Sequence, residues 1–88
     1  MRESVIETHL VKRVKELGGE IRKVRFLDRR GAPDRFVILP TQMAVWVELK
    51  APGQKAKPNQ LREHQRLRAM GQSVVVIDSI EGVEALLQ

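Results

Sequence analysis

The chain of 88 residues contains no cysteine and no tyrosine, and its aromatic residues are limited to one Trp and two Phe. The lack of cysteine excludes disulfide bonds and thiolate zinc sites, and it is typical of a protein from a reducing, intracellular compartment. The scarcity of aromatic side chains argues against nucleic-acid binding by base stacking. The functions that remain must depend on charged and polar groups.

Long hydrophobic runs are also absent. The longest purely aliphatic stretch covers residues 74–77, and the first residues lead into a charged segment rather than into the apolar core of a signal peptide. Neither secretion nor membrane spanning is expected, so a cytoplasmic location and no membrane partner are predicted.

Basic residues are in excess. Sixteen Lys and Arg against 11 Asp and Glu give a formal net charge of +5, with a sequence pI near 10.2. This balance favours a polyanionic partner, most simply nucleic acid. The content of 42% hydrophobic and 31% charged residues is that of a globular protein, and the length predicts a single domain over residues 1–88.

The spacing of apolar residues predicts an α/β fold. Helices are predicted over residues 3–17, 59–70 and 80–87, and strands over residues 20–26, 35–39, 43–49 and 73–77. In the middle helix, Leu61, Leu67 and Met70 are expected to pack inward, with Gln60 and His64 on the arc between them. The last strand follows a helix, so we expect it to join the sheet in a parallel pairing.

Glu48-Leu49-Lys50 closes the strand predicted over residues 43–49. Side chains alternate along a strand, so Glu48 and Lys50 point to one face and Leu49 to the other. Buried charges are costly unless they are paired, hydrogen-bonded or bound to a metal. The pattern therefore indicates either a functional site or, more simply, a solvated ion pair at the end of a strand.

The preceding strand is expected to form an antiparallel hairpin with this one, because only residues 40–42 separate them. If those residues are the whole loop, Phe36 lies opposite Trp46 and Asp34 lies opposite Glu48 on the same face. Two carboxylates this close repel each other and take up a proton unless a divalent cation lies between them. A slip of one residue would send Asp34 to the other face.

Three polar side chains on the predicted helices are further candidates. Glu7 lies inside the apolar stripe of the first helix, where it is a site residue, a rim residue whose carboxylate turns to water, or half of an internal ion pair. Glu3, one turn earlier, competes for the same role, and Glu7 is preferred. Gln60 either orients a water molecule or a phosphate, or is a half-buried amide satisfied by the backbone. For His64 a hydrogen-bonded histidine at the edge of the core is favoured over a metal ligand, since no second His or Cys lies at ligand spacing.

Basic side chains cluster in two predicted loops, on either side of the hairpin. The candidates for contacts with a nucleic-acid backbone are Arg29, Arg30, Lys55 and Lys57. For the two lysines, an ordinary solvated linker is an equally good interpretation.

The elements and motifs together resemble a VRR-NUC domain of the PD-(D/E)xK nuclease superfamily. Pro33-Asp34 matches the PD element and Glu48-Leu49-Lys50 the (D/E)xK element, while Glu7 matches the helical acid and Gln60 the glutamine of the following helix. The resemblance implies a restriction-endonuclease-like αβββαβ core, with a central mixed sheet flanked by helices.

The residue types also suit phosphodiester hydrolysis on chemical grounds. Mg²⁺ or Mn²⁺ prefers hard oxygen ligands, which Asp34, Glu48, the Leu49 carbonyl and Glu7 can supply. Lys50, beside the cation, is fitted to position or activate the attacking water, and Gln60 would orient that water or the phosphate.

We therefore expect a metal-dependent endonuclease acting on DNA. The resemblance implies action on branched DNA such as four-way junctions, a homodimer, and a phage-encoded protein in a bacterial host. A non-catalytic nucleic-acid-binding module on the same fold, a small basic subunit that binds an acidic protein, and restriction-type or tRNA-splicing-type nucleases remain as alternatives. The sequence does not distinguish DNA from RNA.

Overall fold

A computed structural model describes residues 1–88 and contains three helices and four strands. The elements in chain order are α1 (Glu3–Glu16), β1 (Glu20–Lys23), β2 (Arg35–Ile38), β3 (Val45–Leu49), α2 (Pro58–Ala69), β4 (Val74–Ile77) and α3 (Ile80–Leu86). The predicted order and type of every element are confirmed. The strands are one to three residues shorter than predicted.

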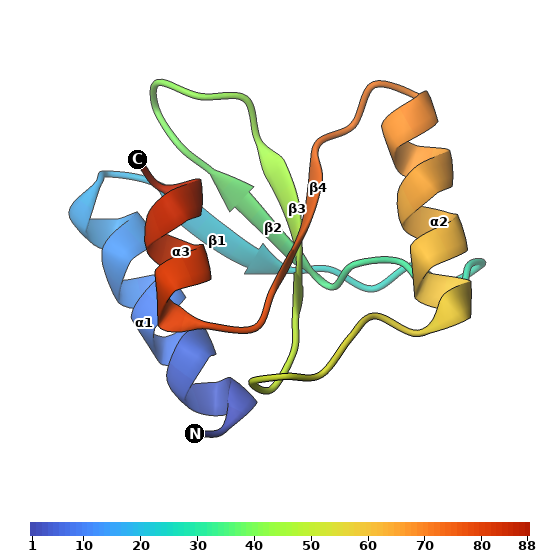
Figure 1. Cartoon of the computed structure of the whole chain (residues 1–88). Coiled ribbons are helices and arrows are strands. Elements are labelled where there is room, and N and C mark those ends of the chain that lie inside the picture. Colours follow the sequence, from blue (N-terminus) through green and yellow to red (C-terminus); the bar gives the residue numbers. More distant parts are fainter.

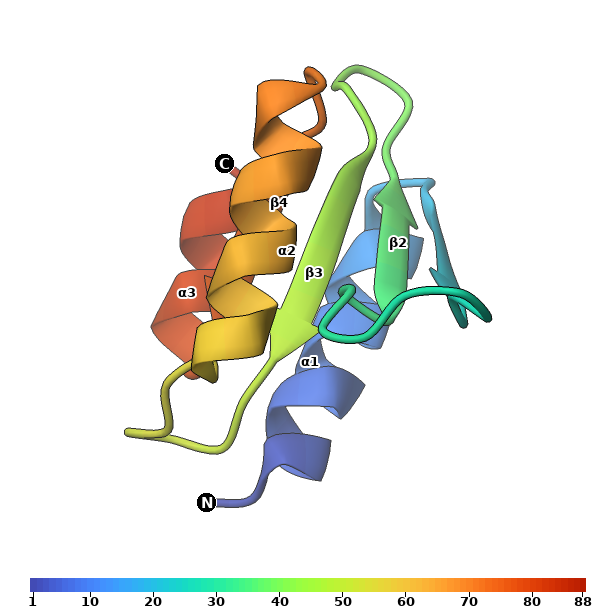
Figure 2. The same ribbon diagram turned by 90° about the vertical axis from the view of Figure 1, so that its right-hand side faces the viewer.

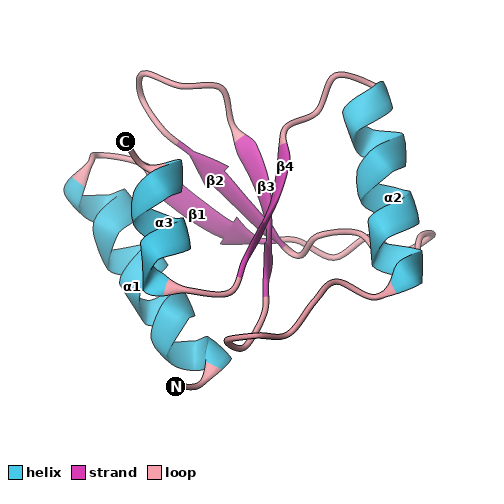
Figure 3. Cartoon of the chain, in the orientation of Figure 1, coloured by secondary structure: helices cyan, strands magenta, loops and turns pink.

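The strands form one mixed sheet in the order β1-β2-β3-β4. β1 and β2, and β2 and β3, pair antiparallel, whereas β3 and β4 pair in parallel, as expected for a strand that follows a helix. Helices α1 and α3 lie side by side on one face, and α2 alone covers the other (Figures 1 and 3). Seen from the side in Figure 2, α2 runs along β3 and β4, so β1 and β2 lie beyond its reach.

The hairpin has the predicted register. Phe36 pairs with Trp46 and Arg35 with Val47. Asp34 precedes β2, and continuing the register by one step would place it opposite Glu48. The two acids are close enough for the charge of Asp34 to act on Glu48.

The hydrophobic core lies between the sheet and the α1–α3 pair. Its helical members include Ile6, Leu10, Val14 and Val83, all with 0% exposure. They pack on the alternate sheet residues of the central strands, namely Val37, Val45, Val47 and Leu49. Removing a side chain from such a core, as in Leu10→Ala, costs about 2–5 kcal/mol.

The packing predicted for α2 is wrong in part. Leu67 is buried, but Leu61 and Met70 are 47% and 57% exposed, and the stripe facing the sheet carries Glu63 and His64 instead. Residues three and four apart share one side of a helix, so Glu63 and His64 line up with Leu67. This orientation places His64 Nε2 3.8 Å from Glu48 Oε1, near the end of β3.

The loop before β2 is held against the start of α2. Gly31 has φ +79°, and a Cβ at this position would lie 2.6 Å from the Asn59 carbonyl oxygen. Only glycine accommodates both the positive φ and this close approach. The loop is thereby fixed just before Asp34.

Candidate nuclease site

Glu48 is the buried acid of the site. It lies near the end of β3, on the face covered by α2, with 7% exposure. No hydrogen bond reaches its carboxylate. The nearest basic side chains are Lys50, with Nζ 3.9 Å from Oε2, and His64, with Nε2 3.8 Å from Oε1.

The protonation of Glu48 reflects its surroundings. Burial, followed by the negative charges of Asp34 and Glu3, raises the pKa of Glu48 from 4.5 to about 7, and the opposing charges of Lys50 and Arg35 do not cancel this. The sequence predicted this repulsion between Asp34 and Glu48. A divalent cation beside such a carboxylate would stabilise its ionised form.

Asp34 and Glu7 are both bound by one arginine. Arg35 Nη1 lies 3.0 Å from Asp34 Oδ2, and Arg35 Nε donates to Glu7 Oε2 at 2.8 Å. Arg35 Nη2 also contacts Glu7 Oε2. The Asp34 side chain remains 58% exposed and open to a substrate, whereas Glu7 is half-buried. Glu3, the competing acid of α1, is exposed, and its charge acts on Glu48.

Gln60 caps α2. Its Oε1 accepts a hydrogen bond from the Lys57 backbone N–H at 2.8 Å, while its NH₂ group makes no hydrogen bond. The interpretation of Gln60 as an amide satisfied by the backbone therefore holds for its Oε1 atom. Its NH₂ group remains able to donate a hydrogen bond to a water molecule or a phosphate.

Among the predicted nucleic-acid contacts, Arg30, Lys55 and Lys57 are exposed and make no ion pair. Arg29 is 49% exposed and lies 4.0 Å from a Glu63 carboxylate oxygen.

The sequence reasoning missed Lys23 and Arg25. With Val24, Asp34 and Arg35 they line a hollow of about 400 Å³. The pairing of Lys23 with Arg35 brings them beside Asp34, and the sequence alone did not predict that pairing.

Two buried polar residues of α2 were also not identified as site residues. Glu63 is 6% exposed and binds Arg66 at 2.8 Å; that hydrogen bond lowers the pKa of Glu63, which marks it as a structural acid. His64 is completely buried, and neither ring nitrogen has a hydrogen-bond partner. The hydrogen-bonded histidine expected from the sequence is therefore not observed.

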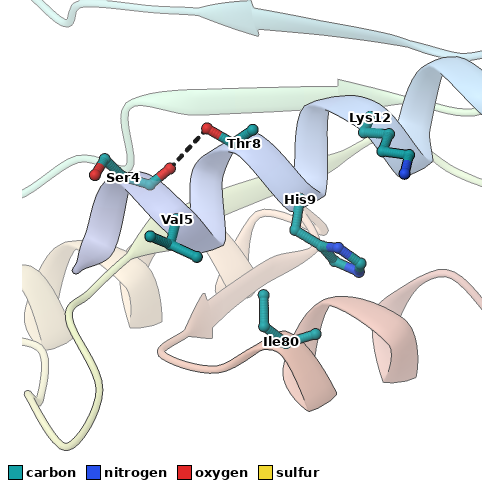
Figure 4. A pocket seen from close by; sticks show the side chains of 6 residues that line it. All are labelled: Ser4, Val5, Thr8, His9, Lys12 and Ile80. Carbon is teal, nitrogen blue, oxygen red and sulfur yellow. Dashed lines mark hydrogen bonds between the residues drawn. The ribbon is translucent and has the colours of Figure 1, made fainter. Parts of the chain in front are cut away.

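A second hollow, of about 390 Å³, lies along α1 and is closed on one side by Ile80 of α3 (Figure 4). Its helical wall consists of Ser4, Val5, Thr8, His9 and Lys12. His9 Nε2 lies 2.8 Å from Glu84 Oε2, so the ring is part of an ion-pair cluster between the two helices. None of the candidate site acids lines this hollow.

The donor set fits a hard divalent cation. Asp34 and Glu48 offer carboxylate oxygens, and their mutual repulsion is visible in the raised pKa of Glu48. No three His, Asp or Glu side chains are close enough together to form a ready-made metal centre. Leu49 packs its side chain into the core on the opposite face, so only its backbone carbonyl can contribute a ligand.

No helix has both the length and the apolar character needed to cross a membrane.

The mixed sheet, the helices on its two faces and the Asp34, Glu48 and Lys50 motif define a nuclease fold of the restriction-endonuclease-like class. No protein-family model matches the chain. The protein named "Putative nuclease p44" from Acyrthosiphon pisum secondary endosymbiont phage 1 is 52% identical over 79 residues, which are 90% of this chain and 85% of that protein. A solved structure described as "VRR_NUC domain" superposes with a TM-score of 0.86 at 40% identity, covering 97% of this chain and 92% of the other. The chain belongs to the VRR-NUC nuclease family of the PD-(D/E)xK superfamily.

Proposed function

We propose that this nuclease is a Mg²⁺- or Mn²⁺-dependent endonuclease that hydrolyses phosphodiester bonds in DNA. The observation that carries the proposal is Glu48, a buried carboxylate without a hydrogen bond, whose pKa is raised to about 7 by burial and by Asp34. Keeping such a group costs stability, and perturbed acids of this kind are concentrated at functional sites.

The acids and one carbonyl have binding roles. Asp34 and Glu48 would hold the cation with the Leu49 carbonyl, and Glu7 would hold a second cation or a coordinated water. When bound, the cation neutralises charge on the phosphoryl oxygens and lowers the pKa of water. Arg35 fixes the Glu7 and Asp34 carboxylates in place.

The remaining side chains act on water and on phosphate. Lys50, with its Nζ 3.9 Å from Glu48, would position the attacking water and exchange a proton with it. The unbonded NH₂ of Gln60 would orient that water or the phosphate. Arg29, Arg30, Lys55 and Lys57, joined by Lys23 and Arg25 beside Asp34, would contact the backbone without reading sequence.

We further propose that the substrate is branched DNA, including four-way junctions, and that the active form is a homodimer. Paired cuts across a junction need two sites, and a symmetric dimer supplies one site from each copy of the chain. The phage relative supports a phage-encoded protein that works in the cytoplasm of a bacterial host.

The test incubates purified protein with supercoiled, linear and four-way-junction DNA, and with RNA, in Mg²⁺, Mn²⁺ or chelator. Wild-type protein should cleave DNA only with metal, and Lys50→Ala should lose cleavage while retaining fold and DNA binding. Lys12→Ala, on the outer side of α1, is the matched control and should cleave normally. Equal cleavage by wild type and Lys50→Ala would contradict the proposal.

A non-catalytic nucleic-acid-binding module is the second candidate, favoured by the ion pair between Glu7 and Arg35, which gives Glu7 a structural partner. In that case DNA binding is indifferent to Mg²⁺, and Glu48→Ala affects only stability. This candidate is excluded if wild type cleaves DNA in a metal-dependent way and Glu48→Ala does not.

A further inference from the structure

His64 has no structural partner that accounts for its burial. The ring is 0% exposed, and both of its nitrogens lack a hydrogen-bond partner. Leaving a buried polar group unsatisfied costs stability. Leucine or methionine would fill the same space between α2 and the sheet without that cost.

The carboxylate that His64 faces is Glu48. His64 Nε2 lies 3.8 Å from Glu48 Oε1, which is about 1 Å longer than a hydrogen bond. The other acid nearby, Glu63, is already bound by Arg66. Burial, together with the charges of Arg68 and Lys50, lowers the pKa of His64.

We infer that His64 is a positioning residue, whose Nε2–H donates to Glu48 Oε1 and holds that carboxylate in the orientation that binds the cation. The inference depends on the proposed metal-dependent function. Glu48 receives no hydrogen bond from another group, and its ion pair with Lys50 is made through Oε2, so His64 is the side chain that faces Oε1. Partners of this kind commonly change metal affinity by 10- to 100-fold.

The first test measures Mn²⁺ affinity by electron paramagnetic resonance, with Tm recorded for every variant. His64→Leu should bind Mn²⁺ 10- to 100-fold more weakly at an equal or higher Tm. His64→Gln, whose amide nitrogen reaches the position of Nε2, should restore affinity to within a few-fold of wild type. His64→Asn, which reaches only the position of Nδ1, should not. His9→Gln is the matched control on α1 and should bind normally.

The outcomes separate this inference from the proposed function. If wild type binds Mn²⁺ and His64→Leu binds it equally well, the positioning role is wrong while the metal site stands. If wild type binds no Mn²⁺, both are wrong.

A second readout needs no metal. Long-range ¹H–¹⁵N spectra of the metal-free protein should show the Nε2–H tautomer of His64, and its signals should shift in Glu48→Gln. The Nδ1–H tautomer would overturn the inference.

Discussion

Phe36 lies directly opposite Trp46 in the β2–β3 hairpin, with ring centroids 4.3 Å apart and planes inclined by 44°. Phe26 adds an edge contact to the same indole, at 5.3 Å. This aromatic cluster links side chains of β2 and β3. Since Asp34 and Glu48 lie two residues further along the same register, the cluster fixes the pairing of the two acids.

Weakening this cluster should loosen the site. Trp46→Leu removes both ring contacts and the hydrogen bond from Trp46 Nε1 to Gln72 Oε1, and should lower the free energy of unfolding by about 1–3 kcal/mol. Urea unfolding measures this loss, and Trp46→Phe should recover part of it. Unchanged stability in Trp46→Leu would show that the register is set elsewhere.

Glu48 should make metal-free stability depend on pH. Its pKa is about 7 in the folded protein and about 4.5 when unfolded, so the folded state binds the proton more tightly. The resulting stabilisation is fully present below pH 4.5 and is lost as pH rises towards 7. Relative to Glu48→Gln, the free energy of unfolding of wild type should therefore fall by about 1–2 kcal/mol between pH 4.5 and pH 7, allowing for screening by solvent.

The measurement is Tm in chelator from pH 4.5 to 8 for both proteins. Added Mg²⁺ at pH 8 should raise the Tm of wild type but not that of Glu48→Gln. A difference in Tm between the two proteins that does not vary with pH would contradict the buried, repelled carboxylate.

The sequence was sufficient to predict the elements and the hairpin register, because period-two alternation and a three-residue loop leave few pairings. It did not predict the rotation of α2. Leu61 and Met70 were expected inside on hydrophobicity, yet the stripe that meets the end of β3 contains Glu63 and His64. His64 lies inward there, 3.8 Å from the buried acid Glu48, a contact between distant segments that local periodicity cannot reveal.

The side chains that bind the candidate acids could not be predicted from local sequence patterns either. Arg35 was read only as the first residue of a strand, whereas its side chain reaches α1 and binds Glu7, 28 residues away. The choice between Glu3 and Glu7 therefore depends on tertiary geometry.

That choice can be tested by paired substitutions in α1. Glu7→Gln should reduce cleavage of four-way-junction DNA by about 10- to 100-fold, as loss of a group that supports a metal site commonly does. Glu3→Gln, an exposed residue one turn earlier, should reduce it less than tenfold. Initial rates at saturating Mg²⁺ decide the order, and circular dichroism controls for folding. The reverse order would move the role of the helical acid to Glu3.

The hollow beside Asp34 should act through charge. Lys23 and Arg25 line it and make no ion pair with any acid, so both are free to neutralise phosphates. Substitution of either by Ala should weaken binding of metal-free protein to DNA uniformly across sequences, and should reduce the slope of log K against log salt by about 1. Fluorescence anisotropy between 50 and 200 mM salt measures the slope, with Lys12→Ala on α1 as the control of equal charge. An unchanged slope in both hollow variants, or an equal change in the control, would mean that the DNA backbone follows another path across the protein.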